Sequence, residues 1–291
     1  MRCLLKTTVS LAATAVLLAA SCAPRVVPER ERVRPAYLTA TIGELLGSLR
    51  ERNAAVSGLQ AQGRLEYRFT YAGRGFRGTA VRLQFAKPGS VYVRGYERLA
   101  GTLFRLVSDG SRFWAENTRG SEVYTGPVLH SVRSEAAGET EIWEGLHPAV
   151  LAEALFLDDI SAERAVCETY PGRYIITLLE LTADGDMVPR RRIWFERERL
   201  RVTRHQVFTA DGRLATDALL GRYERVSEGG EIDLPHHFSI SRPWEELRLE
   251  LDLRRVRLNP EFNEELFNYQ VPPGFRLRDL EAESEEDAEH R

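Results

Sequence analysis

Cysteine and long apolar runs are scarce in this sequence. Its 291 residues include three cysteines. Cys3 lies in the apolar N-terminal segment, so that only Cys22 and Cys167 remain, too few for a fold held together by several disulfides. The apolar stretch at residues 7–20 is shorter than the roughly 20 residues that a transmembrane helix needs. A mature chain of about 270 residues is long enough for one large domain or two small ones.

Patterns that indicate catalysis or metal binding are also lacking. There is no G-x-S-x-G nucleophile elbow, and the G-x-G-x-x-G pattern of Gly73, Gly75 and Gly78 has strand-like sequence on both sides, which predicts a hairpin tip instead of a nucleotide site. His236 and His237 are adjacent, so in a strand they would point to opposite faces and could not share a metal. We expect no enzyme activity, metal or cofactor. A hydrolase whose carboxylates meet only in space is a minor alternative.

The N-terminus has the pattern of an exported protein. Positive charge followed by apolar residues 7–20 is typical of a secretory signal peptide. Small residues directly before Cys22 make the segment resemble the lipobox of bacterial lipoproteins, although Ala19 stands where that motif usually has leucine. The resemblance implies that residues 1–21 are removed and that Cys22 is the site of lipid attachment, with acyl chains such as palmitate. An ordinary signal peptide that leaves Cys22 as a plain thiol is the alternative.

Two polar segments flank the central part of the chain. Residues 22–36 form a Pro-rich, charged tether of about 40 Å behind the lipidated cysteine. Residues 279–291 are acidic and lack aromatic residues, which predicts a disordered tail, or alternatively a partner-binding segment. Loss of Arg2 and Lys6 with the signal changes the formal net charge from -3 to about -5, which argues, as export does, against nucleic acid as a partner.

Two segments have the periodicity of helices. Helical spacing of the apolar residues begins after Thr41 and Glu44, which form a capping-box pattern. The apolar positions of this helix are Ile42, Leu45, Leu46 and Leu49. Residues 148–156, "PAVLAEALF", predict a second helix in the middle of the chain.

The rest of the central part alternates apolar and polar residues from Leu59 onwards. Asp-Gly pairs at 109–110, 184–185 and 211–212 separate such runs and predict hairpins. About a dozen antiparallel strands are expected, and so long a sheet must curl to bury one face. The predicted fold is mainly β (α+β), a curved antiparallel sheet forming an incomplete β-barrel. The N-terminal and mid-chain helices would act as a lid over a hydrophobic cavity.

The order of short motifs along residues 38–276 resembles a known family, the bacterial lipoprotein carriers and receptors LolA and LolB and their outer-membrane lipoprotein-sorting relatives. The first half contributes Pro88, Arg94, Asp109, Gly110, Trp114, Tyr124 and Gly126. The second half ends in Leu258, Asn259, Pro260, Leu266, Phe267, Pro272, Pro273 and Gly274, which is more like the sorting proteins. The chain is longer than a typical receptor, and its acidic tail is additional.

The resemblance implies a half-barrel domain over residues 37–278 that binds acyl chains in an apolar cavity. The candidate cavity residues are Leu65, Tyr67, Phe69, Val81, Leu83, Phe85, Phe104, Leu106 and Trp114. Any one of them could instead belong to a closed core. Leu99 lies in a predicted hairpin turn and could be the apolar residue that transfers ligand to a membrane, or equally an ordinary loop residue.

These features together predict an outer-membrane lipoprotein that faces the periplasm and takes part in lipoprotein or lipid localisation. Its partners would be lipoprotein acyl chains or lipids, the membrane that holds Cys22 and a periplasmic lipoprotein carrier, and the chain itself would be a monomer. A scaffold lipoprotein with the same fold and no lipid cargo is the alternative function. The absence of Asp directly after Cys22, where the chain has Ala23, favours the outer membrane.

Overall fold

The computed structural model describes residues 36–69, 75–128, 147–157, 160, 164–227 and 231–281. The predicted signal peptide, lipid-attachment site and tether, and the acidic tail beyond residue 281, lie outside the described residues. Among the described residues, the helices are all too short or too polar to cross a membrane.

The described residues form one 14-stranded sheet in the order β14-β6-β5-β4-β3-β2-β1-β13-β12-β11-β10-β9-β8-β7. Its strands are β1 (Gly58–Phe69), β2 (Gly75–Ala86), β3 (Ser90–Glu97), β4 (Gly101–Asp109), β5 (Arg112–Asn117), β6 (Glu122–Pro127), β7 (Arg164–Tyr170), β8 (Arg173–Leu181), β9 (Met187–Glu196), β10 (Val202–Phe208), β11 (Leu214–Val226), β12 (Ile232–Arg242), β13 (Leu247–Leu258) and β14 (Arg276–Asp279). The β14–β6 pair is parallel and the others are antiparallel. Strand β1 joins the two halves of the sheet because it pairs with both β2 and β13.

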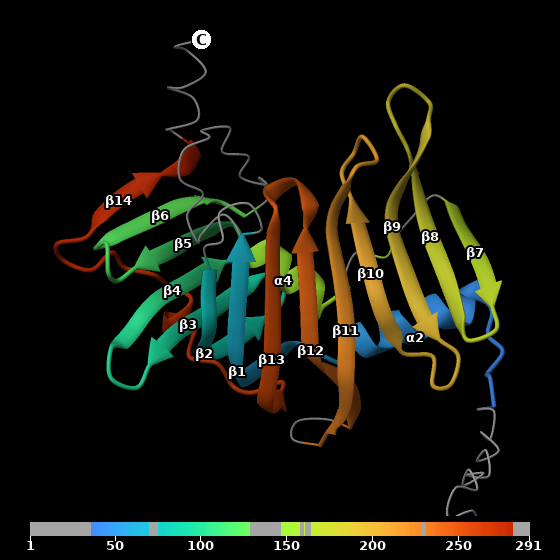
Figure 1. Ribbon diagram of the computed structural model, residues 1–291, viewed down its shortest axis with the longest axis horizontal. Coiled ribbons are helices and arrows are strands. Elements are labelled where there is room, and N and C mark those ends of the chain that lie inside the picture. The colour runs from blue at the N-terminus through green and yellow to red at the C-terminus, as the bar shows by residue number, and fades with distance from the viewer. Residues whose placement is uncertain are drawn as a thin grey trace, which may run out of the picture. The chain divides into compact units, whose positions relative to one another are not determined.

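The sheet twists and curves strongly without closing (Figure 1), so that β7 and β14 remain its two edges. Accumulated right-handed twist of this kind is the usual behaviour of a long antiparallel sheet. The predicted fold class, a curved and unclosed antiparallel sheet with one N-terminal and one mid-chain helix, is confirmed.

Both helices, α2 (Ile42–Ala54) and α4 (Pro148–Leu155), lie on the concave side of the sheet. The predicted capping box is present at the start of α2, where the Glu44 backbone N–H donates to the Thr41 hydroxyl and the Thr41 N–H donates to the Glu44 carboxylate at 2.7 Å. Helix α4 begins with proline, which has no N–H to leave unpaired, directly after its N-cap residue His147.

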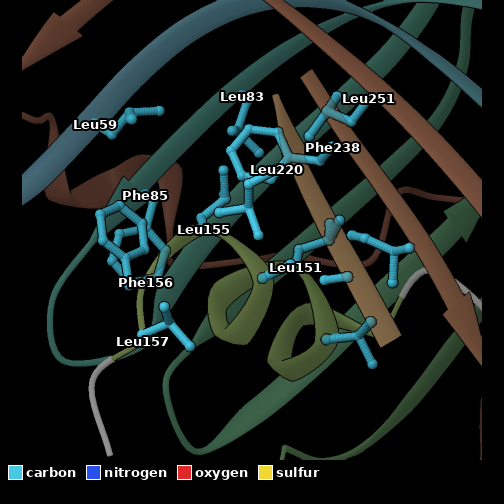
Figure 2. Packing of buried hydrophobic residues seen from close by; sticks show 14 of the residues in the cluster. Leu59, Leu83, Phe85, Leu151, Leu155, Phe156, Leu157, Leu220, Phe238 and Leu251 are labelled. Atoms are coloured by element: carbon cyan, nitrogen blue, oxygen red, sulfur yellow. The ribbon is translucent and has the colours of Figure 1, made fainter. Parts of the chain in front are cut away.

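One continuous hydrophobic core joins the concave face of the sheet to the two helices. Figure 2 shows Leu151 and Leu155 of α4 pointing into this core, beside Leu220 of β11 and Leu83 of β2. The rings of Phe85 and Phe156 stack with their centroids 4.2 Å apart. Each such side chain contributes about 1.5–3 kcal/mol when it leaves water, so packing on the concave face stabilises the fold.

Tight turns at the three Asp-Gly pairs confirm the predicted hairpins. Gly110, Gly185 and Gly212 all have positive φ, between 79° and 98°, a region that glycine adopts without steric cost. The prediction of a hairpin tip at Gly73, Gly75 and Gly78 is only partly correct, because strand β2 begins within this pattern. The last two of these glycines lie inside β2, and Gly73 is outside the described residues.

The C-terminal segment wraps the convex face of β4, β5 and β6. It contains the short 3-10 helix η3 (Glu264–Leu266) and then β14, which adds a parallel strand to the edge of β6. Phe262 packs so closely on Gly58 that a Cβ there would lie 2.4 Å from its ring. Asn259 fastens the start of this segment, because its Oδ1 accepts from the N–H groups of Ser57 and Gly58 at 2.7 and 3.2 Å.

Candidate functional site

Most of the candidate cavity residues meet on the concave face. Tyr67 is the most exposed of those in the core, at 6%, and its burial raises the pKa of its phenol. The core positions come from strands β1, β2 and β4, with β3 between the last two, and are Leu65, Tyr67, Val81, Leu83, Phe85, Phe104 and Leu106. The backbone of Phe69 ends β1 opposite Leu247, and its side chain is outside the described part of the chain.

Trp114 does not join these residues. Its neighbours Phe113 and Ala115 belong to the concave core, and alternation along β5 therefore turns the indole to the convex face. There it stacks on Tyr269 of the C-terminal segment, with ring centroids 6.0 Å apart. The aromatic residue that strand β5 contributes to the concave side is Phe113.

The convex contact continues into a buried polar network. Tyr269 donates from its hydroxyl to Glu116 at 2.9 Å, and Arg105 lies 3.2 Å from the same carboxylate oxygen. Burial, followed by the hydrogen bond to Glu116, raises the pKa of Tyr269. This network fixes the C-terminal segment on the convex face of the sheet. Trp114 packs against that segment and does not line the concave face.

Helix α4 occupies the middle of the concave face (Figure 2). Five of its eight residues are buried, namely Pro148, Val150, Leu151, Ala154 and Leu155. The candidate residues of β1, β2 and β4 are thus packed in a core that includes α4. An apolar ligand could reach this face only by taking the place of α4 side chains.

Charged and polar groups lie at the edge of this core, and the sequence analysis did not select them as site residues. Arg191 of β9 is buried, and its Nη2 donates to Glu153 of α4 at 2.8 Å. Its Nε and Nη1 have no hydrogen-bond partner among the residues that the structure describes. Strand alternation could have predicted that Arg191 faces inward, because it is in phase with the core residues Ile193 and Phe195. The Arg191–Glu153 pair attaches α4 to the sheet.

Two buried histidines flank α4. His147 caps the helix by accepting from the Ala149 N–H at 3.3 Å, and its ring packs edge-on against Phe113. Burial, reinforced by the nearby charge of Arg242, lowers the pKa of His147 to about 4. Burial and the charge of Arg191 lower the pKa of His205 to about 3.

Sequence alternation could not place His205 correctly. A register irregularity between Val202 and Arg204 interrupts the pairing of β10 with β9 and turns His205 inward. By contrast, the expectation for the adjacent pair holds. His236 is buried, whereas 40% of the His237 side chain is exposed. No metal-binding cluster of His, Cys, Asp or Glu occurs among the residues that the structure describes.

Leu99 is fully exposed, at 100%, in the turn between β3 and β4. The turn residues are Arg98, Leu99 and Ala100, and Gly101 follows with φ 75°. An exposed leucine at the tip of a hairpin fits a residue that touches a membrane, and single exposed apolar residues are also common on protein surfaces.

Fold and core together define a class of protein, an open half-barrel whose concave apolar face is covered by short helices. No protein-family model matches the chain, and no curated protein is significantly similar to it in sequence. The chain is similar in structure to a domain classed with the outer membrane lipoprotein-sorting proteins from Vibrio parahaemolyticus, with 12% identity, a TM-score of 0.49, and coverage of 77% of this chain and 95% of that one.

Two further solved structures resemble the chain. A LolA superfamily protein from Nitrosomonas europaea has 12% identity and a TM-score of 0.48, with 79% of this chain and 98% of that one covered. A DUF1329 family protein from Desulfovibrio piger has 15% identity and a TM-score of 0.46, with coverage of 77% and 94%.

Proposed function

We propose that this protein is an outer-membrane lipoprotein, facing the periplasm, that binds acyl chains of lipoproteins or lipids on the concave face of its sheet. It acts in lipoprotein or lipid localisation, as a LolB-like receptor or a sorting protein. The observation that carries this proposal is helix α4, a short apolar element that covers an apolar sheet face where a closed fold would have a second sheet. The resemblance to lipoprotein carriers and receptors agrees with it.

The state with α4 docked and the state with an acyl chain bound in its place have similar free energies. About ten buried methylenes contribute roughly 8 kcal/mol at ~0.8 kcal/mol each. Undocking α4 exposes four aliphatic side chains, Val150, Leu151, Ala154 and Leu155, at a cost of roughly the same size. Because neither state dominates, ligand can enter and leave, as a transfer protein requires. No covalent step is involved.

Leu99 and Cys22 connect this binding face to a membrane in the proposed mechanism. The lipid on Cys22 holds the chain at the membrane surface, and residues 23–36 give the domain a reach of about 40 Å. Leu99 inserts its exposed side chain into the lipid surface while cargo passes from a periplasmic lipoprotein carrier. The chain acts as a monomer in this scheme.

The test of acyl binding uses a soluble variant without residues 1–21 in which Cys22→Ala removes the lipid site. We expect co-purified lipid by mass spectrometry and saturable binding of a fluorescent fatty acid. Leu151→Ala weakens α4 docking and should raise the probe affinity about thirtyfold, since it relieves competition worth ~2 kcal/mol. The control Val107→Ala removes a buried side chain of β4 that lies outside the concave core and should leave probe affinity unchanged.

A scaffold lipoprotein without cargo is the second candidate, and the close packing of the concave face favours it, in particular the stacking of Phe85 on Phe156. For a scaffold, both the parent and Leu151→Ala would purify without lipid and fail to bind the probe. That pair of results would refute the acyl-binding proposal.

The role of Leu99 has its own test. Leu99→Glu should leave fatty-acid binding intact and slow the delivery of bound probe to liposomes at least fivefold, because a carboxylate is strongly disfavoured in hydrocarbon. Leu219→Glu is the control, since Leu219 is 46% exposed on strand β11, away from the hairpin turn. Delivery at the parent rate by Leu99→Glu would exclude a transfer role for this turn.

A further inference from the structure

A separate pocket of about 320 Å³ lies between the second half of α2, the β9–β10 turn and the ends of β11 and β12. We call it the arginine pocket, because four of its residues are arginines. Its lining consists of Ser48, Leu49, Arg52, Ala55, Phe195, Arg199, Leu200, Arg201, Val202, Tyr223, Arg225, Glu231, Ile232 and Asp233. None of the candidate cavity residues lines it.

Positive charge exceeds negative charge in the arginine pocket by two, four arginines against Glu231 and Asp233. Asp233 already serves two of the arginines, because it pairs with Arg201 and lies 2.8 Å from the Nε of Arg225. These two pairs lower the pKa of the Asp233 carboxyl, with the hydrogen bond from Arg201 as the largest cause. Glu231 is distant, at 3.8 Å from Arg225, and its side chain is 81% exposed.

The other two arginines have no carboxylate partner among the described residues. Arg52 projects from the last turn of α2 beside the phenol of Tyr223, and Arg199 is exposed in the β9–β10 turn. Tyr223 is held in place, since its hydroxyl donates to the Val202 carbonyl and Arg201 lies over its ring at 5.1 Å. Two guanidinium groups therefore border the pocket without an ion pair to a described carboxylate, and a further acidic group, Glu196, lies nearby and accepts from the Arg199 backbone N–H at 3.2 Å.

The floor of the arginine pocket is apolar. Leu200 and Ile232 are partly exposed there, and they lie over the core residues Leu49, Phe195 and Val202, which are 3%, 2% and 1% exposed. An apolar floor beneath a cationic rim suits an amphiphile better than a fully hydrated ion. A volume near the lower end of the usual range for small-molecule pockets, about 300–1,000 Å³, admits a headgroup and a few methylenes but no complete lipid.

We propose that the arginine pocket binds a phosphate group carried on an alkyl chain, with the phosphate between Arg52 and Arg199 and the first methylenes on Leu200 and Ile232. Phosphate matches the excess of two positive charges and offers several acceptor oxygens to the guanidinium forks. The site is independent of acyl binding beneath α4, because it uses different residues and needs no movement of that helix.

Isothermal titration of the soluble Cys22→Ala chain with decyl phosphate, below its micellar concentration, tests the proposal. Decyl phosphate should bind at least tenfold more tightly than decanoate, decyltrimethylammonium or inorganic phosphate. Arg52→Gln and Arg199→Gln should each weaken it about tenfold, the loss typical of one charge-assisted hydrogen bond. Arg254→Gln is the matched control, an exposed arginine of β13 outside the pocket. Raising the ionic strength should weaken binding in the parent.

Each ligand and each variant in this titration tests a separate part of the proposal. Inorganic phosphate binding as tightly as decyl phosphate would overturn the amphiphile assignment, and decanoate binding as tightly would overturn the choice of phosphate. Unchanged affinity in both arginine variants, with thermal unfolding at the parent temperature, would refute the site. A chain that binds decyl phosphate at this site, but neither co-purifies with lipid nor binds the fluorescent fatty acid, would keep the arginine pocket and refute only the proposed function.

Discussion

Acid should destabilise this fold through two buried histidines before most carboxylates are protonated. His147 and His205 have their pKa lowered to about 4 and about 3 by burial, whereas an unfolded histidine titrates near 6.5. The unfolded chain therefore binds more protons than the folded chain between pH 6.5 and about 4. Stability contributed by the neutral rings is present above pH 6.5 and is lost as the pH falls through this window.

The magnitude follows from the same values. Between pH 7 and pH 5, each histidine costs about 2 kcal/mol of unfolding free energy, and the two together cost about 4 kcal/mol. For His205 the cost of protonation is only partly offset, because neither ring nitrogen has a well-formed hydrogen bond among the described residues. The groups that face it are Arg191 and Arg52, which oppose protonation, and Asp217 and the Ala154 backbone, which favour it.

Urea unfolding of the soluble chain at several pH values measures this loss. His205→Leu removes one titrating group and fills the site with an apolar side chain of similar size, so it should lose about 2 kcal/mol less than the parent between pH 7 and pH 5. A parent whose unfolding free energy changes by less than 1 kcal/mol over this range would refute the reasoning. So would a His205→Leu variant with the full pH dependence of the parent.

Two further changes test the packing around the concave face. Glu153→Ala leaves Arg191, whose side chain is 8% exposed, without its partner. We expect a loss of ~2–3 kcal/mol in urea unfolding, less than the ~3–5 kcal/mol of a fully buried pair because Glu153 is 26% exposed. Gly95→Ala places a Cβ 2.1 Å from the ring of Phe104, and overpacking at this buried ring should cost ~1–3 kcal/mol by the same assay.

Matched controls make these two results interpretable. Glu180→Ala breaks the exposed pair with Arg190, whose atoms are 3.4 Å apart, and should cost less than ~1 kcal/mol. Gly47→Ala meets no atom within 4 Å on α2 and should stabilise the chain by ~0.5–1 kcal/mol. Equal effects of Glu153→Ala and Glu180→Ala would show that α4 is not attached through Arg191. A neutral Gly95→Ala would show that Phe104 can move.

Local patterns in the sequence determined the elements of this fold. The Thr41–Glu44 capping box specified where α2 begins, and Asp-Gly pairs specified three hairpins, because these features depend on backbone dihedrals and on contacts a few residues apart. Alternation likewise assigned Leu83 and Phe85 to one face of a strand, which became the concave core. The number of strands and the absence of a covering layer were enough to require a curved sheet.

The tertiary structure decided what alternation leaves undefined, namely which face of each strand is concave and what covers it. Phe113, not Trp114, faces the core, since the C-terminal segment supplies Tyr269 on the convex side. A bulge in the pairing of β10 turned His205 inward, and β14 paired in parallel with β6 from more than a hundred residues away. These outcomes depend on contacts between distant segments, whose energies no local periodicity encodes. The arginine pocket is likewise assembled from four such segments, so its charge could be seen only after folding had brought them together.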